Sequence, residues 1–237
     1  MLRVIHRVGW SMALVVSVVA PGCQTHAEHR AVMSKQEQAG LTPDAVLADL
    51  KAGNERFVRG EARTAPTVRE AEQTAAGQYP KAIVLGCLDS RVPPEVIFDQ
   101  GIGDIFVGRV AGNFENQDLL GSMEFGTKAA GAKVIVVLGH TACGAIKGAI
   151  DRVELGNLTN MVANIEPAVQ AVPVGAAGRT SADHDYVDRV AEANVRQTVA
   201  DIVERSPVLA ELVRTGQIRV VGAMYDLASG RVRWLDS

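Results

Sequence analysis

The sequence predicts an α/β fold with a mostly parallel central sheet of about four strands, one added edge strand and flanking helices. Apolar runs rich in Val and Ile are typical of buried strands, and they lie at 82–87, 105–107, 133–139 and 218–224. Stretches with helical periodicity separate these runs, so strands and helices alternate along the chain. The turn at 227–230 followed by residues 231–234 predicts a strand that pairs back on the edge of the sheet.

The predicted helices occupy the segments around and between the strands. Thr42-Pro43-Asp44 is typical of a helix start, with Thr as the N-cap, Pro at the first helical position and an acid in the first turn. The apolar stripe of the helix that begins there runs to Phe57 and is interrupted by Gly53 and Asn54. Further helices are predicted within 62–78, up to Phe98, at 118–130, from Cys143, within 157–171, at 183–204 and from 207 to 216. The helix at 118–130 has on its apolar side Leu119, Leu120, Met123 and Phe125.

The first 23 residues resemble an export signal rather than part of this domain. The apolar run at 8–20 follows a basic start and is too short to span a bilayer comfortably. It ends at Ala20-Pro21-Gly22-Cys23, which resembles a bacterial lipoprotein cleavage site, although Ala20 stands where Leu is usual. Cys23 would then be the lipidated N-terminus of an exported, periplasmic protein. Two alternatives stay open: cleavage after Ala20 that releases a soluble periplasmic protein, and an uncleaved segment that acts as an anchor.

The polar residues at 24–41 show no periodicity and are predicted to be a tether, which leaves 42–237 as one domain. The net charge of −3 and the absence of a run of Lys or Arg argue against a nucleic-acid partner. Aromatic residues make up only 4% of the chain, so a surface for stacking bases is not expected. Three cysteines are too few for a disulfide framework.

Two cysteines and a histidine follow two of the predicted strands. Cys87 comes directly after the run that begins at 82, and His140 and Cys143 come after the run at 133–139. Because chemistry in open α/β sheets gathers at the carboxyl ends of the strands, these residues are expected to meet there. Two thiolates and one imidazole suit zinc and leave one coordination position open for water. Two other interpretations are buried structural cysteines with a core histidine, and a redox pair, which the absence of a C-x-x-C motif makes weaker.

Asp89 and Arg91 lie two residues apart, so on an extended segment their side chains face the same side. On a surface such an ion pair stabilises little. Beside a metal, an Asp that Arg keeps ionised accepts a hydrogen bond from bound water and sets its orientation. A further alternative is that Asp89 is a fourth ligand, which would close the site.

The combination Cys87-x-Asp89-x-Arg91 and His140-x-x-Cys143 resembles the β-class carbonic anhydrases, and the resemblance extends from about Leu50 to Asp226. It implies that Cys87, His140 and Cys143 bind one zinc ion, that Asp89 and Arg91 form the catalytic pair beside it, and that the protein is a homodimer or a dimer of dimers.

The resemblance also implies three substrate-binding residues. Gln78 falls where the family often places a Gln that hydrogen-bonds substrate across a dimer interface, and Val92 and Phe106 fall where apolar side chains line the carbon dioxide pocket. Without the resemblance, Gln78 would be read as a polar residue at a helix end, and the other two as core. Phe125 departs from the family pattern, which often has Tyr there. Val84 stands where the bicarbonate-inhibited subgroup has Trp, which favours the open, water-ligated type of site.

The implied function is reversible hydration of carbon dioxide to bicarbonate and a proton by zinc-bound hydroxide, the reaction of a carbonate dehydratase. Two alternatives remain on the same residues. One is hydrolysis of a carbon dioxide analogue such as carbon disulfide or carbonyl sulfide, and the other is a zinc-binding or redox-sensing module without turnover.

Overall fold

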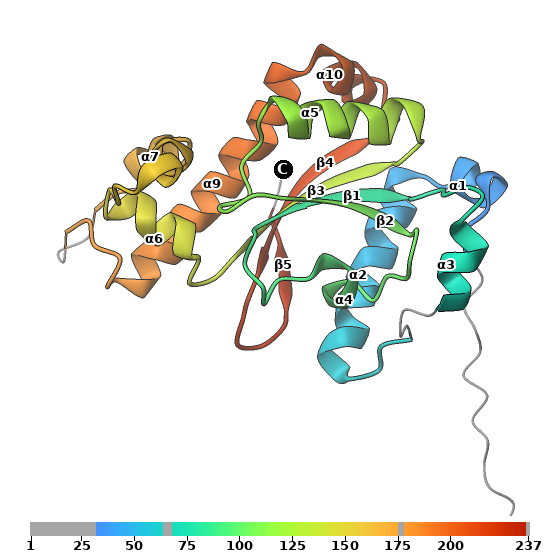
Figure 1. The fold of residues 1–237 in the computed structure, drawn as a ribbon, viewed down its shortest axis with the longest axis horizontal. Coiled ribbons are helices and arrows are strands. Elements are labelled where there is room, and N and C mark those ends of the chain that lie inside the picture. The colour runs from blue at the N-terminus through green and yellow to red at the C-terminus, as the bar shows by residue number, and fades with distance from the viewer. Residues whose placement is uncertain (1–31, 64–67, 175–177, 236–237) are drawn as a thin grey trace, which may run out of the picture.

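The centre of the protein is a five-stranded sheet with strand order β2-β1-β3-β4-β5. The computed structural model describes residues 32–63, 68–174 and 178–235. Its strands are β1 (Ala82–Gly86), β2 (Ile105–Arg109), β3 (Val134–His140), β4 (Arg219–Tyr225) and β5 (Val232–Trp234). The first four are parallel, and β5 pairs antiparallel with β4 at the edge (Figure 1). The predicted α/β class and the predicted edge strand are therefore confirmed.

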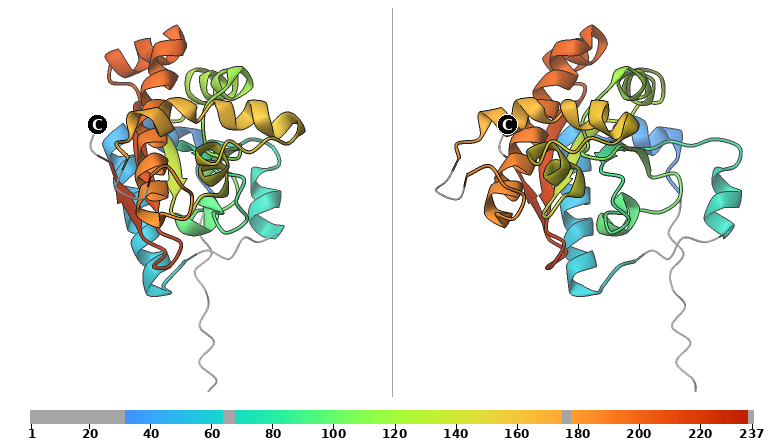
Figure 2. Two further views of the ribbon diagram at one scale, coloured as in Figure 1. Left: turned by 90° about the vertical axis from the view of Figure 1, so that its left-hand side faces the viewer. Right: turned by 60° about the vertical axis from the view of Figure 1, so that its left-hand side comes forward.

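Helices cover both faces of the sheet (Figure 2). Alternate residues of β1 and β3 point to opposite sides, so Leu85 and Val137 join one apolar cluster while Val84 and Val136 join another. All four are fully buried, because each face is covered by helices. The helices are α1 (Lys35–Gly40), α2 (Pro43–Arg59), α3 (Val68–Thr74), α4 (Pro94–Ile97), α5 (Gln117–Glu124), α6 (Gly144–Ile150), α7 (Gly156–Ala163), α8 (Glu166–Ala171), α9 (His184–Arg205) and α10 (Pro207–Arg214), with a π-helical segment η1 (Phe125–Ala129).

The helix α2 begins as predicted, with the Thr42 hydroxyl accepting a hydrogen bond from the Ala45 backbone N–H. Gly53 lets this helix approach α4, since a Cβ at this position would lie 1.9 Å from the backbone oxygen of Phe98. Asn54 is buried, and its amide donates to the carbonyl oxygens of Ile97 and Gly230. The residues that interrupt the apolar stripe therefore attach α2 to α4 and to the C-terminal hairpin.

The tether predicted for 24–41 is wrong in its described part, because Lys35–Gly40 forms α1. Ser34 and Glu37 make a reciprocal capping box at its start. Gln38 is buried, and its side-chain amide donates to the carbonyl oxygens of Pro80 at 2.7 Å and Ala130 at 2.8 Å. These polar contacts, which hydrophobic periodicity does not reveal, fasten the segment to the domain.

The helix predicted at 118–130 changes type half-way, from α5 to the π-helical η1. The prediction that Phe125 lies on the apolar side is wrong, since this residue is 61% exposed in the single chain. A π-helical turn contains more residues than an α-helical turn, so the face that points inward shifts. Gly126 is buried instead, and a Cβ there would lie 2.7 Å from Cδ1 of Ile83.

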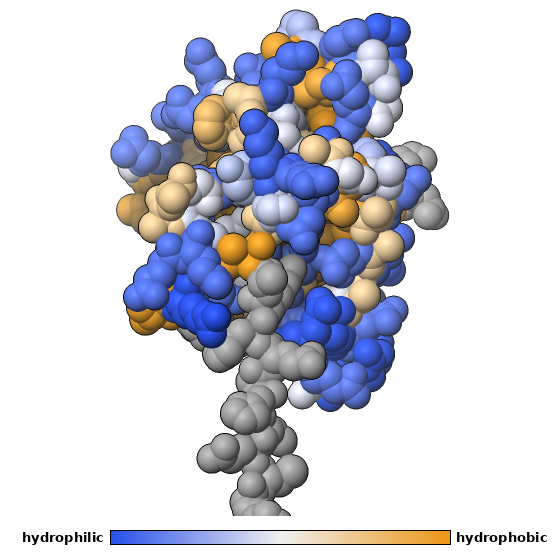
Figure 3. Space-filling view, turned by 90° about the vertical axis from the view of Figure 1, so that its right-hand side faces the viewer, coloured by the Kyte–Doolittle hydropathy of each residue, from blue (hydrophilic) through white to orange (hydrophobic). Residues whose placement is uncertain are grey.

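The face around α1 and α3 carries several separate apolar patches among hydrophilic side chains (Figure 3). In the chain as described, no helix has the length and apolar character needed to cross a bilayer. The predicted signal at 1–23, with Cys23, lies outside the described residues.

Candidate metal centre

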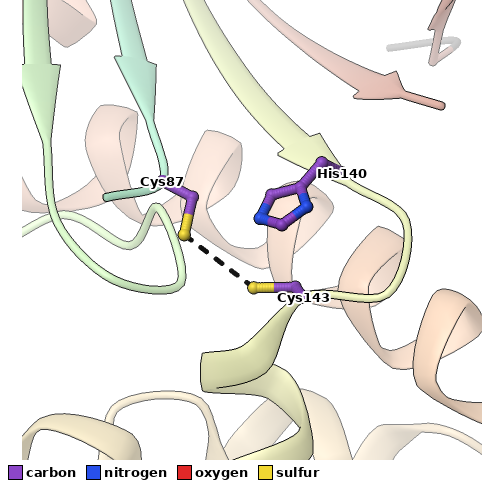
Figure 4. Close-up of side chains that lie close together, drawn as sticks. All are labelled: Cys87, His140 and Cys143. Carbon is purple, nitrogen blue, oxygen red and sulfur yellow. Dashed lines mark hydrogen bonds between the residues drawn. The ribbon is translucent and has the colours of Figure 1, made fainter. Parts of the chain in front are cut away.

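Cys87, His140 and Cys143 converge at the carboxyl edge of the sheet, as their positions after two strands predict. Cys87 follows β1, His140 ends β3, and Cys143 is the N-cap of α6, so neighbouring parallel strands bring them together. Their side chains point toward one another (Figure 4), and their potential ligand atoms all lie within 4.8 Å of one another. The two sulfur atoms are 3.9 Å apart, close to the ~3.8 Å that two Zn–S bonds of 2.3 Å span at a tetrahedral angle. The arrangement therefore fits zinc.

Backbone amides surround the sulfur of Cys87. The N–H of Gly112 lies 3.3 Å from this sulfur and the N–H of Asp89 lies 3.5 Å from it. Donors of this kind stabilise a thiolate, the form that binds metal. Gly112 is itself held by α9, where the side-chain amide of the buried Asn194 donates to its carbonyl oxygen at 2.7 Å.

The two thiols share one environment but differ in acidity. A hydrogen bond from Cys143 lowers the pKa of Cys87 to about 4, although burial alone would raise it. The same contact with Cys87, together with burial, raises the pKa of Cys143. The contact therefore favours a thiolate at Cys87 and a thiol at Cys143, whereas a divalent cation stabilises both as thiolates.

His140 presents one ring nitrogen to the sulfur atoms and the other to the backbone. Its Nδ1 lies 2.9 Å from the carbonyl oxygen of Thr141, and because a carbonyl only accepts, Nδ1 carries the proton. The lone pair is then on Nε2, which is buried and has no hydrogen-bond partner among the residues that the structure describes. A buried acceptor without a partner is unfavourable, and a metal ion at this position would supply the missing partner.

Asp89 and Arg91 form the predicted pair beside these ligands. The guanidinium of Arg91 holds both carboxylate oxygens and keeps the pKa of Asp89 well below its usual range, although partial burial opposes this shift. The carboxylate oxygen Oδ2 lies 4.0 Å from Nε2 of His140. Asp89 therefore lies next to the three ligands and outside their group.

Arg109 is a supporting residue that the sequence interpretation missed. Its Nε donates to the carbonyl oxygen of Cys87 at 2.8 Å and its Nη2 to that of Asp89 at 2.5 Å. Arg109 is the last residue of β2, so the neighbouring strand fixes the segment that carries Cys87 and Asp89. Its position at the carboxyl end of a predicted strand was the feature of the sequence that could have indicated a role at the site.

A model of the carbonic anhydrase family matches residues 82–232. The chain belongs to this family. Carbonic anhydrase 2 of Mycobacterium tuberculosis is 38% identical over 192 residues, which cover 80% of this chain and 91% of the relative. The carbonic anhydrase of Mycolicibacterium smegmatis is also 38% identical over 192 residues, covering 80% of this chain and 92% of the relative.

Solved β-carbonic anhydrases have the same fold. An enzyme of Aspergillus fumigatus superposes with a TM-score of 0.61 and 27% identity, covering 81% of this chain and 90% of that structure. The Coccomyxa enzyme, solved in complex with acetazolamide, superposes with a TM-score of 0.60 and 26% identity, covering 80% and 86%. The chain is thus a β-carbonic anhydrase, a zinc enzyme with carbonate dehydratase activity, and the group described above is able to bind a metal ion.

The three predicted substrate-binding residues have different surroundings in this carbonic anhydrase chain. Gln78 is exposed in the segment before β1. Val92 is fully buried in the apolar cluster that contains Val84 and Val136. Its N–H donates to the carbonyl oxygen of Asp89 at 3.1 Å. Phe106 packs against the cluster on the opposite face of the sheet, with its ring centroid 6.4 Å from that of Phe125.

Proposed function

We propose that this enzyme hydrates carbon dioxide reversibly at the zinc site formed by Cys87, His140 and Cys143. The observation that carries the proposal is the group of three buried ligand atoms within 4.8 Å of one another, with the Asp89 carboxylate beside it. Three protein ligands are typical of catalytic zinc, which lowers the pKa of water to near 7 and thereby supplies a nucleophile at neutral pH.

In this proposal Asp89 orients the nucleophile and selects the product form. Its carboxylate accepts hydrogen bonds only, and Arg91 keeps it ionised. It therefore holds the O–H of a water molecule so that a lone pair points away from Asp89 toward carbon dioxide. The same charge favours bicarbonate bound with its own hydroxyl toward Asp89, and bicarbonate in other orientations is repelled.

We further propose that a second copy of the chain completes the substrate site. Leu88 and Phe125 are 66% and 61% exposed in the single chain, and Phe125 contacts Phe106. Exposed apolar side chains near a site are typical of a surface that a partner covers. In this homodimer, or dimer of dimers, the exposed amide of Gln78 binds substrate across the interface, and Val92 and Phe106 contribute to the apolar pocket.

A carbon dioxide hydration assay on zinc-loaded protein, with Cys87→Ser alongside, tests the function. We expect turnover in the parent, and loss of both zinc and turnover in the variant. Equal rates would exclude catalysis at this site, and bound zinc without turnover would favour a non-catalytic module. A parallel assay with carbonyl sulfide and carbon disulfide separates hydration from hydrolysis of these analogues; faster turnover of either analogue than of carbon dioxide would overturn the proposed substrate.

For the location, we propose export with a lipid anchor at Cys23. The supporting observation is the sequence pattern, a basic start and an apolar run that ends in small residues before Cys23. Mass spectrometry of the mature N-terminus, with Cys23→Ser as control, tests this proposal. We expect an acylated Cys23 in the parent and soluble or unprocessed protein in the variant. An intact Met1 in both proteins would contradict export, and an unmodified N-terminus after Ala20 would contradict lipidation.

A further inference from the structure

The segment between the ligands His140 and Cys143 has an unusual backbone conformation. Ala142 has a φ of 55°, in the left-handed region that residues other than Gly, Asn and Asp rarely adopt. An Ala keeps this conformation only when its surroundings hold it there. The contacts of this segment therefore affect how both ligands are presented.

One peptide unit of the segment is hydrogen-bonded on both sides. Its carbonyl oxygen, from Thr141, accepts a hydrogen bond from Nδ1 of His140 at 2.9 Å. Its N–H, from Ala142, donates to Oδ1 of Asp188 at 2.9 Å. The carboxylate, the peptide and the imidazole are thus in series, and the imidazole ends in Nε2, which has no partner within the described part of the chain.

Asp188 reaches this peptide from a rigid position. It lies in the second turn of α9, next to the fully buried Val187, and this helix packs across β3 and β4. The neighbouring contacts of Thr141 are neutral. Its N–H donates to the carbonyl oxygen of Tyr225 at 3.0 Å, and its hydroxyl accepts from the N–H of Leu227 at 3.1 Å. Asp188 therefore brings a carboxylate to a loop otherwise held here by neutral groups.

We propose that Asp188 is a positioning residue for the zinc site and acts on His140 through the Thr141–Ala142 peptide. Its carboxylate holds Ala142 in the left-handed conformation. It also polarises the peptide, which makes the Thr141 carbonyl a stronger acceptor for Nδ1–H. A metal-binding histidine commonly donates its other N–H to a carboxylate or a carbonyl, and here the carboxylate acts one peptide farther away.

The inference rests on the proposed zinc site, and its first test measures zinc affinity without activity. Metal-free protein competes with a chromogenic chelator for zinc. We expect Asp188→Ala to bind zinc about tenfold more weakly or worse. We expect a smaller loss for Asp188→Asn, whose amide oxygen still accepts from Ala142. Asp185→Asn removes an exposed acid from the same helix. Its zinc affinity should stay within about twofold of that of the parent, because salt screens an exposed charge.

A second variant separates loop positioning from the fold. Ala142→Gly removes the cost of the left-handed conformation, so adding it to Asp188→Ala should recover part of the lost affinity. The absorption bands of the cobalt-substituted variants should shift for Asp188→Ala and return toward the parent in the double variant. Circular dichroism of the metal-free proteins should be unchanged.

Three results would overturn the inference. The first is parental zinc affinity in both Asp188→Ala and Asp188→Asn. The second is an equal loss in Asp185→Asn, which would indicate a general charge effect. The third is a loss of zinc affinity in Asp188→Ala that accompanies unfolding, while Asp188→Asn folds and binds zinc normally with an unchanged cobalt spectrum. This combination would indicate a structural role alone. If the parent and Cys87→Ser bind zinc equally, the proposed site itself fails, and this outcome is distinct from the other three.

Discussion

Arg91 holds the carboxylate of Asp89 with two parallel hydrogen bonds, from Nε to Oδ1 at 2.9 Å and from Nη2 to Oδ2 at 2.7 Å. The backbone N–H of Arg91 adds a third bond to Oδ1 at 3.0 Å. The carboxylate is thereby fixed in orientation and kept ionised next to the proposed zinc ligand His140. This pair differs from an ordinary surface ion pair because its acidic partner is only 15% exposed and faces His140.

The first prediction concerns this pair. Arg91→Ala frees the carboxylate to rotate and to approach the metal as a fourth ligand, so we expect the rate of carbon dioxide hydration to fall roughly 10- to 100-fold. Zinc content, measured by atomic absorption, should stay at one ion per chain, since none of the three ligands has changed. Arg214→Ala removes a comparably exposed arginine of an ion pair on α10 and serves as the control. An unchanged rate in Arg91→Ala would show that the orientation of Asp89 is unimportant.

Metal removal should expose the site to oxidation. Without zinc, the low pKa of Cys87 favours a thiolate 3.9 Å from the sulfur of Cys143. A thiol-oxidising reagent such as diamide can therefore convert the two cysteines to a disulfide. We expect the metal-free protein to form this disulfide or a thiol adduct several-fold faster than the zinc form. Peptide mapping by mass spectrometry measures both products. Equal rates in the two forms would mean that the metal does not protect the thiols.

The close approach of α2 to α4 gives a prediction for stability. Gly53→Ala places a Cβ against the backbone oxygen of Phe98, which cannot move without shifting α4. We expect the free energy of unfolding to fall by about 3 kcal/mol. Gly121→Ala lies within α5, where a Cβ meets nothing within 4 Å, so the better helix former should stabilise by up to about 1 kcal/mol. Urea denaturation measures both, and equal effects would contradict the packing argument.

A pH-dependent contribution comes from Glu192 on α9. Hydrogen bonds from Arg233 on β5, and then from Arg196, lower the pKa of this carboxyl. The folded state therefore binds fewer protons than the unfolded state, whose Glu has a pKa near 4.3. The stabilisation is present above about pH 4.3 and is lost as the pH falls through the lower folded pKa.

We therefore expect Glu192→Gln to lower the free energy of unfolding by about 0.5–1 kcal/mol at pH 7 and by less below pH 4. Urea denaturation of the metal-free protein at both pH values measures the difference and avoids the pH dependence of zinc binding. Glu204→Gln, at an exposed acid of the same helix, is the control. A deficit in Glu192→Gln that grows on acidification would have the wrong sign for this mechanism.

The strands and the meeting of Cys87, His140 and Cys143 at the sheet edge were predictable because the relevant pattern is local. A buried parallel strand is a continuous apolar run, as at 134–140, and a ligand that directly follows such a run must lie at the carboxyl edge of the sheet. The helix start at Thr42 was equally local, since the N-cap and the first turn are adjacent in sequence. Val92 and Phe106, in contrast, were recognisable only through the family resemblance.

The features that the sequence did not predict depend on contacts between distant segments. Gln38 docks α1 through carbonyl groups of Pro80 and Ala130, 42 and 92 positions away. In η1, Gly126 packs closely against Ile83, and Phe125 is turned outward. Neither kind of contact leaves a periodic signal in the sequence, because Gln38 and Gly126 are an ordinary polar and an ordinary small residue when considered alone.

The sequence by itself determined the fold class, the order of the strands and of most helices along the chain, and the residue types that meet at the sheet edge. Only the tertiary structure decided how those residues are held. It assigns the proton of His140 to Nδ1 through Thr141. It also brings two residues of α9 close to the site: Asp188 bonds to the loop between His140 and Cys143, and Asn194 bonds to Gly112, whose N–H lies against the sulfur of Cys87. The physical reason is that strand formation follows from short-range hydrophobic patterns, whereas the orientation of a ligand follows from hydrogen bonds whose geometry exists only after the chain has packed.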